Sequence, residues 1–212
     1  MPLVDKADIT LYYAPRTRAF RTLWLLEELG RDYRIEHVDY ARGGHKRADY
    51  LKINPMGKVP AVVDQGLTIV ETGAIFVHLA DKYSPGELAP LTGDPKRPDY
   101  LRWLFFAAGV MEPAFCEKFF KWEIPSHRVA WGSFADMERT TIEGIAAGRP
   151  WLTGDRFTAA DVFVASNLHF GMLTDLFPKD GPIAAYVGKC AERPALKRAL
   201  KIEEENIAKM QT

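Results

Sequence analysis

The stretch of chain that decides the fold begins with Asn54-Pro55-Met56-Gly57-Lys58-Val59-Pro60 and ends with Glu71-Thr72-Gly73-Ala74-Ile75. Between these motifs, apolar runs at 59–63 and 67–70 flank Asp64-Gln65-Gly66, whose composition is typical of a turn between paired strands. Pro60 is compatible with the start of a strand, where its missing N–H is not needed. The stretch therefore predicts a hairpin followed by a helix, which brings a backbone edge, a lysine cation and a helix N-terminus into one small domain.

The residues upstream predict a strand, a helix and a second strand. Residues 9–13 form a β-branched and aromatic run, and apolar side chains then recur at helical spacing from 20 to 26 until Gly30 ends the helix. Residues 33–38 again have the composition of a strand. Together with the hairpin and the helix after it, these elements make residues 1–83 a predicted α/β domain.

The second half of the chain predicts helices alone. Residues 84–98 are rich in proline and glycine, which disfavours both helix and strand, so we expect a linker there. Beyond it, the pattern predicts a long aromatic-rich helix at 100–121, kinked at Pro113, an amphipathic helix at 128–147, and three shorter helices. Residues 99–212 are therefore predicted to form an all-helical domain.

Composition restricts the classes of partner. The 212 residues are 47% hydrophobic, enough for a sizeable core, and contain 28 lysines plus arginines against 28 aspartates plus glutamates. A balanced charge gives no general attraction to nucleic acid or to anionic membranes, so we expect a small-molecule partner. No apolar stretch of signal-peptide or membrane-spanning length occurs in the sequence, which favours a cytoplasmic protein without a membrane partner.

The cysteines and histidines predict neither a disulfide framework nor a metal site. Cys116 and Cys190 are the two cysteines, and they lie far apart in the sequence. The five histidines show no metal-ligand spacing such as His-Glu-x-x-His. We therefore expect reduced thiols and no bound metal.

The turn before the first helix, Ala14-Pro15-Arg16-Thr17-Arg18, lies where α/β domains often place reactive sulfur, because the helix dipole and free N–H groups stabilise a thiolate. The turn contains no cysteine, which excludes a dithiol motif. A thiol at this site must then come from a bound ligand, held by the Thr17 hydroxyl and the arginine guanidinium groups. The alternative is that Thr17 only caps the helix and that the arginines are solvated.

Taken in order, a set of segments makes the chain resemble the glutathione transferase superfamily over essentially its whole length: 11–15, 23–30, 54–60, 71–72 and 157–161. The last segment is a folding signal, because Thr158 as N-cap and Asp161 at N3 form a capping-box-like pair. The resemblance implies an N-terminal thioredoxin-like domain, a C-terminal helical bundle, glutathione as co-substrate and a symmetric homodimer.

The resemblance also implies which residues hold the cysteinyl and γ-glutamyl parts of glutathione. The peptide bond before Pro60 is expected to be cis, and the Val59 backbone is expected to pair with the cysteinyl part. Glu71 and Thr72 match the acid and hydroxyl that receive the γ-glutamyl end at a helix N-terminus. Many relatives have serine in place of Thr72, a departure that keeps the hydroxyl.

Basic side chains are expected to meet the glycyl carboxylate of glutathione. By resemblance, Lys58 and the His45-Lys46 pair are the groups that do so. For His45 the alternative is a loop residue that faces solvent.

Three residues compete for the activation of the glutathione thiol. Serine-type relatives have their hydroxyl at the position of Thr17, cysteine-type relatives have their thiol at the position of Arg18, and tyrosine-type relatives use a first-strand tyrosine that aligns with Tyr12. We favour Thr17 because the helix N-terminus already favours an anion there. The alternatives are that Tyr12 is a core residue of its strand and that Arg18 is either a cation that lowers the thiol pKa or a surface charge.

The acceptor substrate is expected to bind between the domains, against the first long helix. Phe105 and Phe115 are the candidates for its apolar contacts, with core packing as the alternative for both. The predicted activity is attack of the glutathione thiolate on an electrophilic, moderately apolar small molecule. The alternatives are a glutathione-dependent peroxidase or disulfide reductase of the same fold, and a non-catalytic ligand-binding protein.

Overall fold

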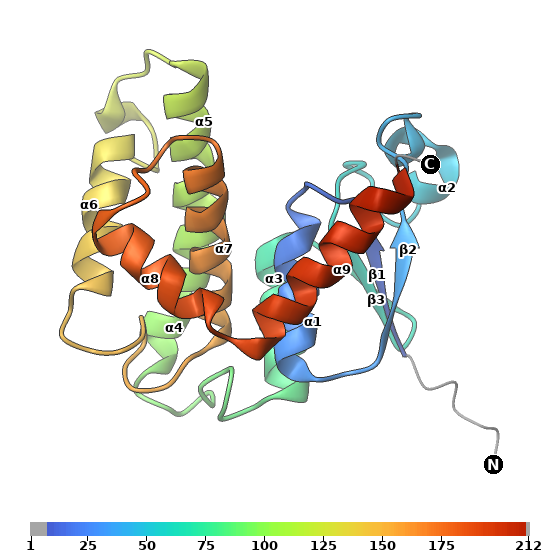
Figure 1. Ribbon diagram of the computed structural model, residues 1–212, viewed down its shortest axis with the longest axis horizontal. Helices are drawn as coiled ribbons and strands as arrows, with labels where there is room; N and C mark the ends of the chain where they lie inside the picture. The colour runs from blue at the N-terminus through green and yellow to red at the C-terminus, as the bar shows by residue number, and fades with distance from the viewer. Residues whose placement is uncertain (1–7, 211–212) are drawn as a thin grey trace. The chain divides into compact units, whose positions relative to one another are not determined.

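The computed structural model describes residues 8–210, which form two compact units (Figure 1). Unit 1 contains the chain up to Leu79 together with the chain from Pro194 onward, and unit 2 is Ala80–Arg193. Unit 1 is an α/β unit and unit 2 is all-helical, so the predicted fold class is confirmed. None of the helices within residues 8–210 combines the length and apolar character that crossing a membrane requires.

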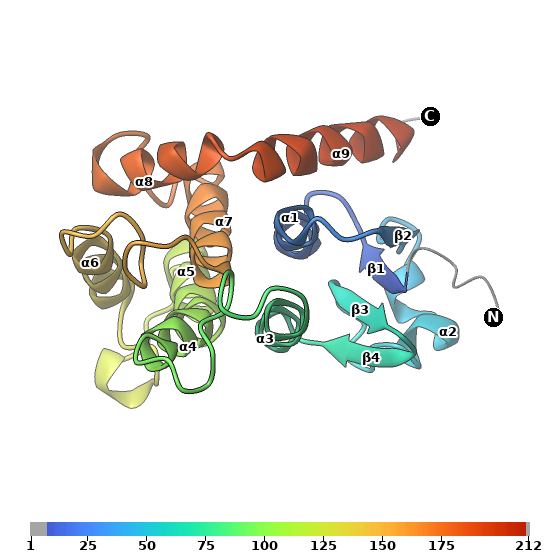
Figure 2. The ribbon, with the colours of Figure 1, turned by 90° about the horizontal axis from the view of Figure 1, so that it is seen from below.

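Unit 1 is built on a four-stranded mixed sheet of order β2-β1-β3-β4. Its elements are β1 Ile9–Tyr13, α1 Ala19–Leu29, β2 Tyr33–His37, the 3-10 turn η1 Gly44–Lys46, α2 Ala48–Leu51, β3 Ala61–Asp64, β4 Leu67–Val70, α3 Thr72–Tyr83, whose last residues belong to unit 2, and α9 Pro194–Met210. Strands β1 and β2 are parallel, and β3 is antiparallel to both β1 and β4. Figure 2 shows α1 and α3 on one face of the sheet and α2 on the other.

The core of unit 1 follows from the alternation along β1 and from the apolar face of α1. Ile9, Leu11 and Tyr13 are buried, whereas the residues between them are half-buried, as expected for a strand whose two faces differ. Helix α1 ends at Gly30, which adopts the left-handed conformation with φ of 59°. The predicted strand at 59–63 begins two residues later, at Ala61, because Pro60 has no N–H to contribute to the ladder.

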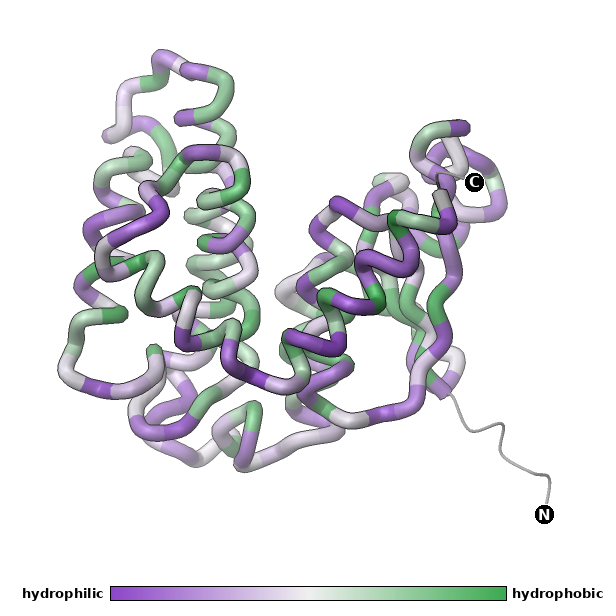
Figure 3. The backbone as a smooth tube through the Cα atoms, viewed as in Figure 1, coloured by the Kyte–Doolittle hydropathy of each residue, from purple (hydrophilic) through white to green (hydrophobic). Residues whose placement is uncertain are grey.

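Helix α9 packs on α1 within unit 1, whereas the sequence placed residues 99–212 in one helical domain. Arg198 Nε donates to a carboxylate oxygen of Glu27 at 2.6 Å, and its Nη2 donates to the Glu27 carbonyl at 2.9 Å. Figure 3 shows hydrophobic and hydrophilic residues alternating along α9, as in an amphipathic helix. Amphipathicity indicates that one face is covered, but it carries no information about which unit covers it.

Unit 2 is a helical assembly. Its elements are α4 Arg97–Phe106, the π-helical turn η2 Ala107–Met111, α5 Glu112–Phe120, the 3-10 turn η3 Ser126–Arg128, α6 Phe134–Ile145, α7 Ala159–Leu173 and α8 Gly181–Ala191. The predicted helix at 100–121 is interrupted by η2 just before Pro113, because proline cannot supply the i→i−4 donor and the ladder must adjust around it. The helix predicted at 128–147 begins at Phe134, after the N-cap Ser133.

The segment predicted as a linker, 84–98, belongs to unit 2, and its last two residues, 97 and 98, already form the start of α4. Leu88 and Ala89 are buried, and the Leu88 carbonyl accepts the Ala159 N–H at 2.9 Å. Arg97 Nη1 donates to the Pro90 carbonyl at 2.8 Å. Proline and glycine exclude regular structure there, but they do not prevent packing.

The capping box expected at the start of α7 is present. The Thr158 N–H donates to one carboxylate oxygen of Asp161 at 2.8 Å, and the Thr158 hydroxyl donates to the same oxygen at 3.0 Å. The other Asp161 oxygen accepts the Leu152 N–H at 2.9 Å and the Tyr186 hydroxyl at 2.7 Å. This buried carboxylate therefore joins the start of α7 to α8 and to the loop before α7.

We expect Thr158→Ala to lower the free energy of unfolding by about 1 kcal/mol or more, because it removes one partner of a buried carboxylate at a helix start. Urea unfolding followed by circular dichroism measures this loss. Thr140→Ala, in the middle of α6, is the matched control and should change stability little, because alanine is the better helix former. Equal effects of the two substitutions would contradict a special role for the Thr158 cap.

Candidate functional site

The sheet register brings three connecting segments to one end of unit 1. The last residue of β4 pairs with the first residue of β3, and that residue also pairs with Tyr12 near the end of β1. The turn 14–18 leaves β1 at this end, residues 59–60 enter β3 there, and residues 71–72 leave β4 there. Three of the segments predicted to bind glutathione therefore converge, each next to a strand end or a helix start.

Thr17 occupies the start of α1 and uses its hydroxyl locally. Its Oγ1 donates to the Ala14 carbonyl at 2.6 Å and accepts the Ala19 N–H at 3.2 Å. The side chain is half-buried, and Arg18 beside it is exposed. The N-cap of α1 is Arg18, so Thr17 lies one residue before it, although its hydroxyl binds the first N–H of the helix. Any hydrogen bond that this hydroxyl donates to a ligand must replace the bond to Ala14.

Arg16 holds an uncommon backbone conformation within this turn. Its φ is 59°, in the left-handed region, which costs a non-glycine residue on the order of 1 kcal/mol. The Arg16 N–H donates to Glu203 Oε1 of α9 at 2.7 Å. Burial raises the pKa of the Glu203 carboxyl, and the bond from Arg16 opposes that rise. Sequence reasoning missed Glu203, since nothing in the local pattern of α9 points to a residue so far away in the chain.

Side chains outside β3 fix the segment that precedes it. The Lys58 carbonyl accepts the Tyr50 hydroxyl at 2.5 Å and the Asn54 side-chain amide at 2.8 Å. A Cβ at Gly57 would lie 2.4 Å from the carbonyl oxygen of His45, so glycine is required for this close approach. The close approach places η1, which carries the predicted His45 and Lys46, directly against the 54–60 segment.

The Val59–Pro60 peptide bond is cis, and Val59 is buried with 8% of its surface exposed. Its N–H donates to the Tyr40 hydroxyl at 3.2 Å. The Tyr40 ring stacks on His45 with 4.1 Å between ring centroids. A ligand that pairs with the Val59 N–H must therefore replace the bond to Tyr40, a residue that the sequence did not single out.

The two predicted lysines lie at the surface of this end of unit 1. Lys46 Nζ donates to the Met56 carbonyl at 3.1 Å, and the Lys58 side chain is exposed. Both are therefore able to offer an ammonium group to a carboxylate in solvent, where such a contact contributes modestly.

Glu71 stands directly before α3 in the left-handed conformation, with φ of 68°. Its carbonyl accepts the Ile75 N–H at 3.0 Å, so the helix begins here, and its side chain is exposed. Thr72 follows as the first helical residue. Non-glycine residues with positive φ are uncommon and tend to lie at functional sites, where the conformation aims a side chain or a backbone N–H.

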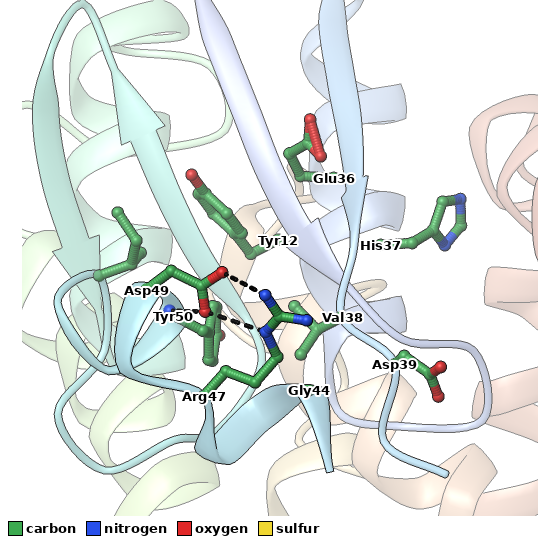
Figure 4. A pocket seen from close by; sticks show the side chains of 10 residues that line it. Tyr12, Glu36, His37, Val38, Asp39, Gly44, Arg47, Asp49 and Tyr50 are labelled. Carbon is green, nitrogen blue, oxygen red and sulfur yellow. Dashed lines mark hydrogen bonds and ion pairs between the residues drawn. The ribbon is translucent and has the colours of Figure 1, made fainter. Parts of the chain in front are cut away.

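Tyr12 lies on the α2 face of the sheet. Its ring is 5.6 Å from that of Tyr50 in α2, and it lines a pocket of about 470 Å³ that Figure 4 shows from close by. This pocket contains no other residue of the predicted glutathione site. Tyr12 is half-buried and lines this pocket, so it is not a core residue, and α1 covers the opposite face of the sheet. A role of Tyr12 in thiol activation stays a prediction.

Tyr13 is the tyrosine on the face that α1 covers. It is fully buried, and its hydroxyl has no hydrogen-bond partner among residues 8–210. Successive residues of a strand face opposite sides of the sheet, so Tyr12 and Tyr13 must lie on different faces of β1. This alternation is the signal in the sequence that could have distinguished the two tyrosines.

The two phenylalanines proposed for the acceptor differ in exposure. Phe115 is 2% exposed and packs within unit 2 against Phe177 at 5.6 Å and Phe134 at 6.4 Å between ring centroids. It is a core residue, because neighbouring rings cover it, and we do not retain it as an acceptor contact. Phe105 in α4 is 63% exposed.

Within residues 8–210, histidine, cysteine, aspartate and glutamate form no group of three or more that could hold a metal.

Comparison with known proteins identifies the family. The model of the glutathione S-transferase N-terminal domain matches residues 7–81. The chain is similar to glutathione S-transferase 2 of Schizosaccharomyces pombe, with 30% identity over 178 residues that cover 79% of this chain and 77% of that protein. The chain belongs to the glutathione transferase family. Its unit 1 accordingly carries the thioredoxin-like sheet of that family, with the helical unit 2 beside it in sequence.

One further relative has a name that gives a different activity, and one solved structure shares the fold. The chain is 29% identical to the disulfide-bond oxidoreductase YfcG of Escherichia coli over 170 residues, covering 73% of this chain and 76% of that protein. The crystal structure of the glutathione transferase URE2P8 from Phanerochaete chrysosporium with oxidized glutathione shares the fold, with a TM-score of 0.80, 24% identity, and coverage of 97% of this chain and 99% of that chain. Family membership supports a glutathione-dependent activity and does not by itself choose between conjugation and reduction.

Proposed function

We propose that this protein is a glutathione transferase in which the glutathione thiolate attacks an electrophilic, moderately apolar acceptor. One observation carries the proposal: the register of the sheet brings the turn before α1, the Val59–Pro60 segment and the Glu71–Thr72 start of α3 to the same end of unit 1. Each offers a group that one part of the tripeptide needs.

The carboxylate and ammonium groups of glutathione find matching partners among the converging residues. Glu71 is suited to the ammonium group of the γ-glutamyl end, and Thr72 with the free N–H groups at the start of α3 is suited to the carboxylate of that end. The Val59 backbone offers an edge for the cysteinyl part. Lys58, together with His45 and Lys46 of η1, provides basic side chains for the glycyl carboxylate.

Thiol activation is assigned to the start of α1. A thiolate bound there gains from the positive end of the helix dipole and from a hydrogen bond donated by the Thr17 hydroxyl, with the Arg18 cation nearby in sequence. The thiol proton leaves to solvent before attack, so Thr17 need not accept a proton. Attack of the thiolate then forms the carbon–sulfur bond and breaks the bond to the leaving group, which for an aryl halide departs as halide ion with the bonding electrons. Because a more stable thiolate is also a weaker nucleophile, the gain in rate is modest.

The likeness to YfcG supports a second candidate, a glutathione-dependent disulfide reductase. The turn 14–18 has no cysteine, so the thiol in either reaction is that of glutathione. Parallel assays with an aryl halide acceptor and with a mixed disulfide of glutathione distinguish the two. Faster turnover of the disulfide would replace the transferase assignment by the reductase assignment.

Homodimers are typical of this family, and a symmetric homodimer of this chain stays a prediction.

We expect glutathione at millimolar concentration to raise the melting temperature, because a ligand selective for the native state stabilises it by mass action. The gain is about 2.7 kcal/mol at a free concentration of one hundred times the dissociation constant. Differential scanning fluorimetry measures the shift. Cysteinylglycine, which lacks the γ-glutamyl end, is the control and should give a much smaller shift. An unchanged melting temperature with glutathione would remove the basis of the proposed function.

A further inference from the structure

The last helix of the chain contacts the turn that precedes the first. Glu203 Oε1 of α9 accepts the Arg16 N–H at 2.7 Å, across 187 residues of sequence. The other oxygen of this carboxylate is buried and has no hydrogen-bond partner among residues 8–210. Elsewhere along the same pair of helices, Arg198 and Glu27 hold α9 on α1. The attachment of α9 to α1 therefore does not depend on the bond between Glu203 and Arg16 alone.

A partly buried carboxylate costs more desolvation free energy than a neutral side chain that could join the same two helices. A partly buried carboxylate with one unpaired oxygen loses solvation that an amide or a hydroxyl would not lose to the same extent. Its bond also goes to a backbone N–H in a left-handed residue, and such a conformation persists only where surrounding groups hold it. The contact thus acts on the shape of the turn more than on the attachment of α9.

The turn in question leads directly into Thr17. Thr17 follows Arg16 in the turn between β1 and α1. The φ and ψ of Arg16 therefore set the orientation of the Thr17 backbone and side chain. The Thr17 hydroxyl lies between the Ala14 carbonyl and the Ala19 N–H, so a small rotation of the turn changes what it can reach. A shift of about 1 Å in such a group is enough to lose much of a directional interaction.

We propose that Glu203 is a positioning residue for thiol activation, which holds Arg16 in the left-handed conformation and thereby aims the Thr17 hydroxyl at the glutathione sulfur. The inference rests on the proposed function in one respect, the binding of glutathione at this turn. In this proposal α9 contributes to thiol activation through Glu203, although it does not contact the glutathione sulfur.

The decisive experiment compares Glu203→Gln with Glu203→Ala. Both variants remove the negative charge, but only the glutamine oxygen can accept the Arg16 N–H, so the difference between them isolates the hydrogen bond. We expect the pKa of bound glutathione, measured from the ultraviolet absorbance of the thiolate, to be about one unit higher in Glu203→Ala than in Glu203→Gln. Turnover below both pKa values should then differ about tenfold, with the dissociation constant of glutathione changed less than threefold.

Two further variants separate positioning from simple loss of structure. Glu205→Ala removes an exposed glutamate from the same helix and should leave the thiol pKa as in the wild type. Arg16→Gly in the Glu203→Ala background should recover part of the lost activity, because glycine adopts positive φ without strain. Failure of this rescue would assign the loss to loosening of α9 and overturn the inference.

The outcomes also distinguish this inference from the proposed function. If the wild type binds no glutathione, the proposed function fails and the role of Glu203 fails with it. If the wild type binds glutathione and lowers its thiol pKa, but Glu203→Ala and Glu203→Gln have the same thiol pKa, then only the positioning role is overturned.

Discussion

Replacing Glu71 by glycine is expected to remove most of the glutathione affinity while leaving the protein at least as stable as the wild type. The carboxylate is proposed to pair with the ammonium group of the ligand, and loss of a charge-assisted hydrogen bond costs about 1.5–3 kcal/mol, or roughly 10–150-fold in the dissociation constant. The backbone of Glu71 has φ of 68°, which glycine adopts without steric cost. Affinity and stability should therefore move in opposite directions.

Isothermal titration of glutathione and urea unfolding measure the two effects. Glu71→Ala should lose the same affinity without the gain in stability, because alanine keeps the strained φ. Lys121→Gly is the matched control: Lys121 closes α5 with φ of 53°, so glycine should stabilise the protein there and leave glutathione binding unchanged. An unchanged dissociation constant in Glu71→Gly would make Glu71 only a charge at a helix start, worth a few tenths of a kcal/mol.

Thr17→Val is expected to raise the pKa of bound glutathione by about one unit toward the ordinary thiol value near 8.5. A hydrogen bond to the thiolate favours the charged form, so removal of the donor disfavours it. Below the thiol pKa, turnover follows the thiolate fraction and should fall about tenfold. Valine keeps the β-branched shape, although loss of the contact to Ala19 should also lower stability by about 1 kcal/mol.

The pH dependence of turnover tests this assignment, and two tyrosine variants serve as its comparison. Thr17→Ser keeps the hydroxyl and should retain the wild-type profile. Tyr12→Phe should also leave the profile unchanged, because Tyr12 lies on the α2 face against Tyr50. A shift in Tyr13→Phe together with no shift in Thr17→Val would instead identify the buried Tyr13 hydroxyl as the donor and refute the role given to Thr17.

Most elements of both units were predictable because their signals are local, whereas the short helix α2 Ala48–Leu51 was not predicted. The helix stop at Gly30, the hairpin around Asp64-Gln65-Gly66 and the capping box of Thr158 and Asp161 each depend on residues within a few positions of one another. Turn chemistry, capping and hydrophobic period are properties of short segments, so the chain specifies them before any tertiary contact forms. The segments proposed to bind glutathione were also identified from the sequence, through a resemblance that includes all of them in order.

Tertiary structure alone decided which surfaces these elements share. The periodicity of α9 predicts a covered face, but only the fold shows that α1 covers it and that Glu203 reaches Arg16. The sequence also did not determine on which side of the sheet Tyr12 lies or which rings cover Phe115. The physical reason is that periodicity records how much of a residue is buried, whereas the identity of its neighbour depends on contacts between segments far apart in the chain, which no local pattern encodes.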